Sequence, residues 1–155
     1  MPSFVREAAL GAALTVTHQI LKHPRNFTMK HVYYGIEDSK DEIQKFLDTN
    51  NISYQYIENE DELLDKVAKE ITDEKVIGWF QGKCEWGPRA LGNRSIIADP
   101  RSDKMKDIVN TKIKFREPYR PFAPSVLRER AEEFFDIPNS TNHFPSHFML
   151  FVVDV

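Results

Sequence analysis

Apolar and polar positions along this chain follow two periods, one typical of helices and one typical of strands. The helical period predicts helices at residues 5–22, 39–51, 59–71, 103–113 and 128–135. Ser39 is expected to cap the second helix, because a serine side chain accepts a hydrogen bond from a free N–H group of the first turn. The first helix carries so many apolar residues that we expect it to need cover on more than one side.

Short apolar or alternating segments predict strands between these helices. They lie at residues 31–35, 52–57, 76–82, 95–99, 121–127 and 147–155. Helices and strands that follow one another through short connections indicate an α/β fold, in which helices cover a mixed, twisted sheet.

Composition supports one ordinary folded unit. The chain has 155 residues, of which 41% are hydrophobic and 12% aromatic, and this is enough for a core and argues against disorder. It lacks a run of about 18 apolar residues that would cross a membrane, and its start is a poor signal peptide. Cys84 is the only cysteine, which excludes an internal disulfide and a cysteine-based zinc site. We therefore expect a cytoplasmic protein without a membrane partner.

Charge is unevenly distributed. The formal net charge is −3, which argues against a general nucleic-acid binder. Between Lys83 and Arg120, however, ten Lys or Arg residues face five Asp or Glu residues, a local charge of +5, so that the rest of the chain carries −8. A basic island in an acidic chain predicts a local anion site.

Two motifs within this island have the chemistry that phosphate requires. The first motif, GKCEWGPRALGNRS, covers residues 82–95, and the second, KIKFREPYRPFAPS, covers residues 112–125. Arginine offers a planar fork, lysine a point charge, and glycine a close approach of the backbone, while the prolines of the second motif stiffen it. The spacing is neither that of a P-loop nor that of a Rossmann fingerprint. The alternative is solvated surface charge, which we favour for Lys104 and Lys106.

Other reactive side chains give weaker evidence for a functional role. Glu85 could act as a base, but we expect it to pair with one of the arginines. The histidine pairs at residues 18 and 23 and at residues 143 and 147 have no evident third ligand, so no metal site is predicted. Cys84 has no convincing histidine partner and is not expected to be a nucleophile. An aromatic ring near the cations could flank a purine.

Residues 78–101, GWFQGKCEWGPRALGNRSIIADPR, and residues 105–127, MKDIVNTKIKFREPYRPFAPSVL, closely resemble the C-terminal domain of the NodU/CmcH family of carbamoyltransferases. Weaker similarity extends on both sides. The resemblance implies that residues 1–24 are the terminal helix of a preceding catalytic domain, with a linker. Residues 25–155 would then be the C-terminal domain, truncated at its C-terminus.

What the resemblance implies is a YrdC-like α/β domain that binds carbamoyl phosphate and ATP, the latter with Mg²⁺. Carbamoyl phosphate would be cleaved to carbamate, and ATP would convert the carbamate to a carbamoyl-adenylate with release of pyrophosphate. The larger N-terminal domain, with an actin-like ATPase fold and a metal site, would then pass the carbamoyl group to a substrate hydroxyl. That metal site has no counterpart in this chain, so the chain alone is not expected to complete the transfer.

The resemblance also assigns site residues. Catalytic roles fall to Lys83, Arg89 and Arg116. Substrate- and nucleotide-binding roles fall to Asn93, Arg94, Ser95, Lys114 and Arg120. The stretch PSFVRE near the N-terminus departs from the family, because it lacks the aspartate of a glycine-aspartate loop. Two rivals stay open: a YrdC-like module that binds nucleotide or RNA without turnover, and a structural remnant that binds neither.

Overall fold

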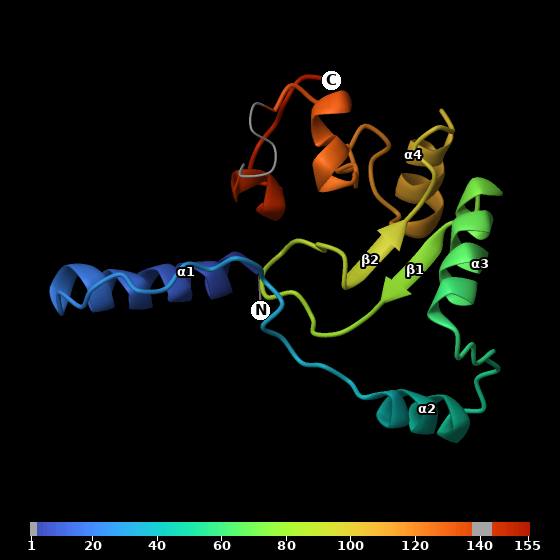
Figure 1. Cartoon of the computed structure of the whole chain (residues 1–155), viewed down its shortest axis with the longest axis horizontal. Helices are drawn as coiled ribbons and strands as arrows, with labels where there is room; N and C mark the ends of the chain where they lie inside the picture. The colour runs from blue at the N-terminus through green and yellow to red at the C-terminus, as the bar shows by residue number, and fades with distance from the viewer. Residues whose placement is uncertain (1–2, 138–143) are drawn as a thin grey trace.

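The computed structural model describes residues 3–137 and 144–155, and it combines helices with a small antiparallel sheet (Figure 1). The α-helices are α1 Ser3–Thr15, α2 Lys40–Thr49, α3 Glu60–Thr72 and α4 Met105–Ile108. The π-helical turns η1 Val16–Ile20 and η2 Val109–Ile113 extend α1 and α4, and the 3₁₀-helices are η3 Arg128–Glu133 and η5 Phe144–Phe148. Strands β1 Ile77–Phe80 and β2 Arg94–Ile97 form the sheet. The α/β class is confirmed.

The helix starts follow from their capping residues. Ser39 accepts a hydrogen bond from the Glu42 N–H at 3.3 Å, and the Ser39 N–H donates to the Glu42 carboxylate at 2.8 Å. This reciprocal capping box begins α2 where the sequence predicts it. Asn59 caps α3 through a single bond, which its side chain accepts from the Glu62 N–H at 3.1 Å. Acidic residues in both first turns add favourable charge at the positive helix ends.

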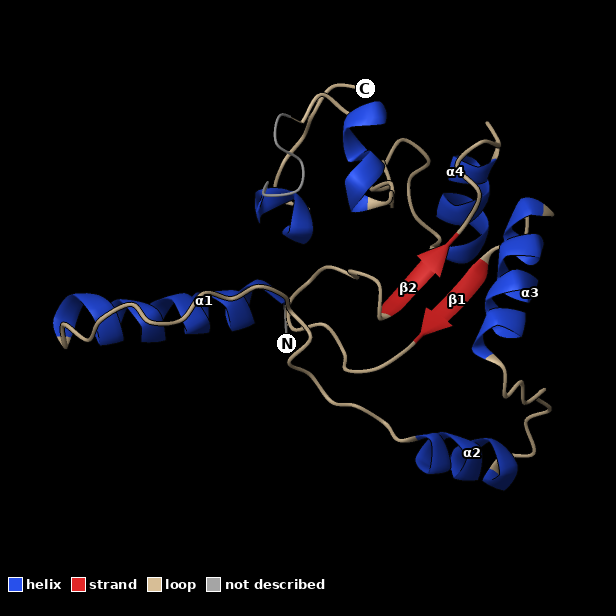
Figure 2. Cartoon of the chain, viewed as in Figure 1, coloured by secondary structure: helices blue, strands red, loops and turns tan. Residues whose placement is uncertain are grey.

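The sheet forms by pairing of two of the predicted strands, which become β1 and β2. Ile77 lies opposite Ile97 and Phe80 opposite Arg94 in an antiparallel register, which confirms strands within residues 76–82 and 95–99. The sheet of the described residues is therefore antiparallel and two-stranded, and the mixed, twisted sheet was wrong. Helix α3 lies beside β1, and α4 follows β2 (Figure 2).

The other predicted strands are corrected by the structure. Residues 52–57 and 121–127 are irregular, and residues 147–155 complete a 3₁₀-helix and continue as irregular chain. Apolar alternation alone does not supply a hydrogen-bonding partner, and Pro121 and Pro124 also lack the N–H that a ladder needs. Residues 31–35 were also wrong as a regular strand.

The segment around residues 32–37 nevertheless pairs with the first motif. The Cys84 N–H donates to the Ile36 carbonyl at 2.8 Å, and the Gly35 N–H donates to the Cys84 carbonyl at 3.0 Å. The Trp86 N–H donates to the Val32 carbonyl at 2.6 Å. These bonds join the start of the first motif to the chain that follows the N-terminal helix.

Buried apolar residues are few, and α1 extends away from them (Figure 1). The apolar side chains buried among the described residues are Val32, Met105, Val109, Ala131 and Phe148. Ile20 and Leu21, at the end of η1 and just beyond it, are 67% and 58% exposed. The cover that we expect for this apolar helix is thus not supplied by the described residues. None of the described helices combines the length and apolar character needed to cross a bilayer.

Gly35 offers a test of this packing, because a Cβ at this position would lie 2.7 Å from the Cys84 Cβ and 2.9 Å from its carbonyl oxygen. We expect Gly35→Ala to lower the free energy of unfolding by about 1–3 kcal/mol, the usual cost of overpacking. Gly78→Ala is the matched control, since a Cβ at Gly78 meets nothing within 4 Å. Urea unfolding measures both variants, and an equal loss in the two would contradict the close approach.

Candidate anion-binding site

Three glycines set the path of the first motif. Gly82, Gly87 and Gly92 have φ angles of 47°, 128° and 113°, in the region that side chains rarely adopt. The first motif therefore needs its glycines for backbone conformation, and the loop they form connects β1 to β2.

Glu85 holds this loop from inside. Its Oε1 atom accepts hydrogen bonds from the N–H groups of Leu91 at 2.7 Å, Asn93 at 2.8 Å and Arg94 at 3.2 Å. Burial on its own would raise the pKa of Glu85, but these backbone hydrogen bonds outweigh it and lower the pKa. The expected pairing with an arginine side chain was wrong. The partners of the carboxylate are backbone groups.

Asn93 and Ser95 form further hydrogen bonds within the loop. Asn93 is 9% exposed; its side-chain amide donates to the Lys83 carbonyl at 2.7 Å and accepts from Gln81 at 3.2 Å. The Ser95 hydroxyl accepts from the Gly92 N–H at 2.9 Å. Both predicted binding residues thus define the shape of the loop. Their contact with a ligand stays a prediction.

Arg94 also bonds to the loop. Its guanidinium donates to the carbonyls of Gln81 at 2.6 Å, Asn93 at 3.0 Å and Gly82 at 3.0 Å. The same group lies 3.4 Å from the centre of the Phe80 ring. A cation with this many partners stabilises the loop, and its predicted role in binding is not tested by these contacts.

Lys83 and Arg89 differ from Arg94. Both are exposed, and neither side chain makes a hydrogen bond or ion pair with any residue in the described ranges. Lys83 is tied down only through its backbone, by a bridge to Glu37 and by the bond from Asn93. Two cations therefore project from a fixed loop without a carboxylate partner among the described residues.

The second motif is anchored by Asn110, which is completely buried in η2. Its side-chain amide donates to the carbonyls of Pro118 at 3.1 Å and Arg120 at 2.9 Å. Its Oδ1 atom accepts from the Arg116 Nε at 2.7 Å, and its backbone carbonyl accepts from the Arg116 N–H at 2.9 Å. One buried side chain thus fixes the backbone on both sides of Pro118 and the stem of the Arg116 guanidinium.

Three cations of the second motif lie near one another, two of them beside an aromatic ring. We call Lys114, Arg116 and Arg120 the cation cluster. Lys114 Nζ lies 5.5 Å, and the Arg116 guanidinium carbon 4.8 Å, from the centre of the Phe122 ring. Partial desolvation lowers the pKa of Lys114, and the charges of Arg116 and Arg120 lower it further. Glu117 provides a distant counter-charge, 3.8 Å from Arg120.

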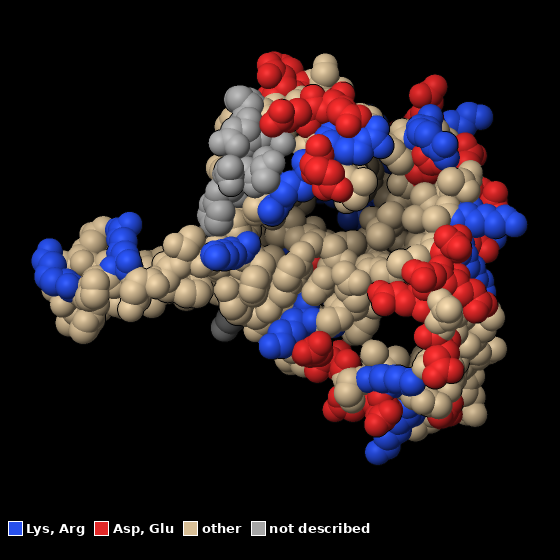
Figure 3. Space-filling view, viewed as in Figure 1, with Lys and Arg blue, Asp and Glu red and all other residues tan. Residues whose placement is uncertain are grey.

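The structure brings the predicted site residues together in two groups. Lys83, Asn93, Arg94 and Ser95 belong to the hydrogen-bonded loop of the first motif, from which Arg89 also projects, and the cation cluster belongs to the second motif. Across the described ranges, no hydrogen bond, ion pair or ring contact joins one motif to the other. Asp and Glu side chains gather instead over α2 and α3 (Figure 3).

Sequence reasoning missed two buried polar residues. Asn110 lies five positions after Met105 and directly after Val109, which are both buried. A polar residue on an apolar helix face was the signal that could have identified it. Asp99, 5% exposed, lies between the two motifs and accepts four hydrogen bonds from Arg101, which lower its pKa to about 2.

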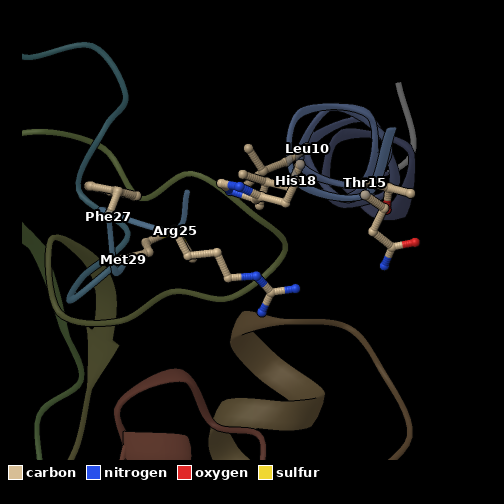
Figure 4. A pocket seen from close by; sticks show the side chains of 8 residues that line it. Leu10, Thr15, His18, Arg25, Phe27 and Met29 are labelled. Atoms are coloured by element: carbon tan, nitrogen blue, oxygen red, sulfur yellow. The ribbon is translucent and has the colours of Figure 1, made fainter. Parts of the chain in front are cut away.

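A pocket elsewhere in the chain lies between α1–η1 and the linker that follows (Figure 4). Its lining is largely apolar, with Arg25 as its permanent charge, and it contains none of the predicted site residues. Within residues 3–137 and 144–155, no three His, Cys, Asp or Glu side chains gather where a metal could be held. His143, one of the four histidines considered above, lies outside the described residues.

Comparison with known proteins identifies relatives of this sequence. The family model described as the carbamoyltransferase C-terminus matches residues 68–155. Nodulation protein NolNO of Sinorhizobium fredii is 45% identical over 150 residues, which cover 95% of this chain and 21% of that protein. Nodulation protein NolO of Bradyrhizobium diazoefficiens is 45% identical over 148 residues, or 95% of this chain and 26% of that protein. The chain thus spans about a quarter or less of the length of these relatives.

Glu85 yields a prediction for the first motif. A hydrogen bond to a charged group contributes about 1.5–3 kcal/mol and a neutral one about 0.5–1.5 kcal/mol. We therefore expect Glu85→Gln, which keeps the acceptor but removes its charge, to speed hydrogen exchange of the Leu91, Asn93 and Arg94 amides by about tenfold at neutral pH. NMR exchange measures this, with the Ile77 amide as internal control.

The pH dependence has a definite sign. Because the folded pKa of Glu85 is lowered, its contribution is complete above the pKa of the unfolded chain and is lost as the pH falls through the folded value. The stability difference between wild type and Glu85→Gln should therefore shrink in acid. A difference that is unchanged or larger in acid would show that the charge of Glu85 does not hold the loop.

Proposed function

This chain belongs to the carbamoyltransferase C-terminal family, and we propose that it binds carbamoyl phosphate and ATP as part of an O-carbamoyltransferase. One observation carries the proposal: Lys114 and Arg116 lie beside the same Phe122 ring, with Arg120 near enough that, after partial desolvation, the two guanidinium charges lower the pKa of Lys114 further. Repulsion of this kind is unfavourable in the absence of an anion and is relieved when a phosphate binds between the charges.

Arg116 has the geometry for phosphate. Its Nε is engaged by Asn110, which leaves the two terminal nitrogens without a hydrogen bond to the described residues. These two nitrogens form the end of the guanidinium fork, which can donate to two oxygens of one phosphate. Lys114 adds a point charge next to it, and Arg120 contributes a third positive charge nearby. We propose that this cluster neutralises the phosphate of carbamoyl phosphate or the leaving phosphates of ATP.

The first motif would complete the site. Lys83 and Arg89 carry exposed charges, without a partner in the described part of the chain, on a loop that Glu85 fixes, and we propose that they contact the anion directly. Asn93 and Arg94 would contribute by holding the loop, while the Ser95 hydroxyl proton is a free donor for a ligand. In this proposal the two motifs approach each other only when an anion bridges them.

The chemistry we propose has three balanced steps. Water replaces the phosphate of carbamoyl phosphate, which gives carbamate and inorganic phosphate. A carbamate oxygen then attacks the α-phosphorus of ATP, pyrophosphate leaves, and a carbamoyl-adenylate forms. Finally a substrate hydroxyl attacks the carbamoyl carbon, loses its proton, and displaces AMP. Phosphoryl and adenylyl transfers depend on charge neutralisation and alignment, which fixed arginines and lysines supply.

The remaining parts of the proposal concern the longer protein. The relatives are about four times the length of this chain, and we propose that a further N-terminal catalytic domain performs the transfer to the hydroxyl. Mg²⁺ would arrive with the phosphates of ATP, which are its usual ligands. The YrdC-like fold implied by the resemblance belongs to the same proposal.

A second candidate function is a module that binds nucleotide or RNA without turnover. The exposed arginines and the Phe122 ring beside two cations would also suit a base and a phosphate. Calorimetry with carbamoyl phosphate, ATP and a short RNA separates the two. Tight RNA binding without a response to carbamoyl phosphate would favour the module.

Arg116 provides the central test of the proposed function. Arg116→Lys should weaken carbamoyl phosphate binding almost as much as Arg116→Ala, because lysine cannot reproduce the fork. The expected loss is about 1.5–3 kcal/mol, or roughly ten- to a hundredfold in affinity. Lys104→Ala, the control, removes an exposed charge before α4 and should change the affinity little. Equal weakening by Lys104→Ala and Arg116→Ala would indicate a diffuse positive field and no specific site.

A further inference from the structure

Asn110 is a buried polar residue that contacts the cation cluster without belonging to it. The residue is 0% exposed, and its amide makes three hydrogen bonds, all to the segment that carries the cation cluster. Ordinary burial of an asparagine needs only that its polar atoms find partners. Here the partners are the carbonyls of Pro118 and Arg120 and the Nε of Arg116. The amide therefore fixes the Arg116 side chain relative to the backbone of Arg120.

The position of Asn110 in the helix adds to this argument. It lies in the π-helical turn η2, directly after α4, and such turns are frequent at functional sites. Its neighbour Val109 is buried too, and the Val109 carbonyl accepts from the Lys114 N–H at 2.9 Å. The backbones of Lys114, Arg116 and Arg120 are therefore tied to two consecutive residues of one rigid turn.

We propose that Asn110 is a positioning residue, which presents the Arg116 fork and the Arg120 side chain to a phosphate before it binds. This inference rests on the proposed function. By occupying Nε, the Asn110 oxygen leaves Arg116 able to bind only through its two terminal nitrogens, which fixes the direction from which the phosphate approaches. Because the cations are already held in position before the ligand binds, the entropy cost of ordering them during binding is reduced.

The test compares two buried neighbours in the full 155-residue chain. Asn110→Ala should weaken binding of inorganic phosphate and carbamoyl phosphate by about tenfold or more, because Arg116 and Arg120 lose their common anchor. Val109→Ala also removes buried atoms from η2 but keeps the backbone carbonyl that accepts from the Lys114 N–H, so it should lower the melting temperature and leave affinity within about twofold. In Asn110→Ala/Arg116→Ala, most of the Asn110 effect should disappear, since coupled residues are not additive.

Two outcomes are distinguishable. If Arg116→Ala weakens phosphate binding but Asn110→Ala binds as wild type does, the positioning role is wrong and the proposed function stands. If Arg116→Ala also binds as wild type does, the proposed function itself fails.

Wild-type protein provides a readout that does not depend on how the variants fold. The Arg116 Nε–H should exchange slowly in NMR spectra without phosphate, because Asn110 already holds it. Arg89, which is exposed and without a side-chain partner in the described ranges, supplies the fast-exchanging reference. An Arg116 Nε–H that exchanges as fast as that of Arg89 in the free protein, and slows only with phosphate, would overturn the inference.

Discussion

Like charges that must stay close together are the constraint around which the second motif is organised. Lys114, Arg116 and Arg120 repel one another; partial desolvation lowers the pKa of Lys114, and the charges of Arg116 and Arg120 lower it further. Glu117, 3.8 Å from Arg120, offsets part of this repulsion, while Lys114 and Arg116 have no carboxylate partner among the described residues. Neutral groups hold Arg116 in place: the buried amide oxygen of Asn110, which accepts from its Nε, and the face of the Phe122 ring. Such partners fix the position of a cation without cancelling its charge.

In the first motif, charged side chains satisfy the backbone groups of the loop, whereas in the second a neutral side chain holds a charged one. Its loop needs glycines with positive φ, and such a backbone exposes N–H groups that helices or strands would otherwise satisfy. Glu85 accepts three of them with one oxygen, and Arg94 satisfies carbonyls on the other side. Glu85 and Arg94 are thus occupied by bonds within the loop, and Arg94 also lies 3.8 Å from Asp38, which leaves Lys83 and Arg89 as the unpaired cations of the loop among the described residues.

How far the sequence predicts this molecule depends on how local each signal is. Capping by Ser39 and the positions of α2 and α3 depend on neighbouring residues, and they were predicted correctly. Strands depend on partners that are distant in sequence. Residues 52–57 alternate like a strand, but they pair with no other strand among the described residues. The cation cluster was recognisable from its charges and prolines. The partners of Glu85 and the role of Asn110 were not, because each depends on how a loop folds back onto a side chain.

We propose, as the central claim, that the cation cluster is a phosphate site whose Arg116 is held in position mainly by neutral groups. The pKa of Lys114 tests this most directly, and NMR titration of its side-chain nitrogen measures it with and without inorganic phosphate. We predict a pKa below the ordinary lysine value in the free protein, owing to partial desolvation and the charges of Arg116 and Arg120. Bound phosphate should raise it, because a nearby anion favours the charged form. A Lys114 pKa that is ordinary in the free protein and unmoved by phosphate would contradict the account.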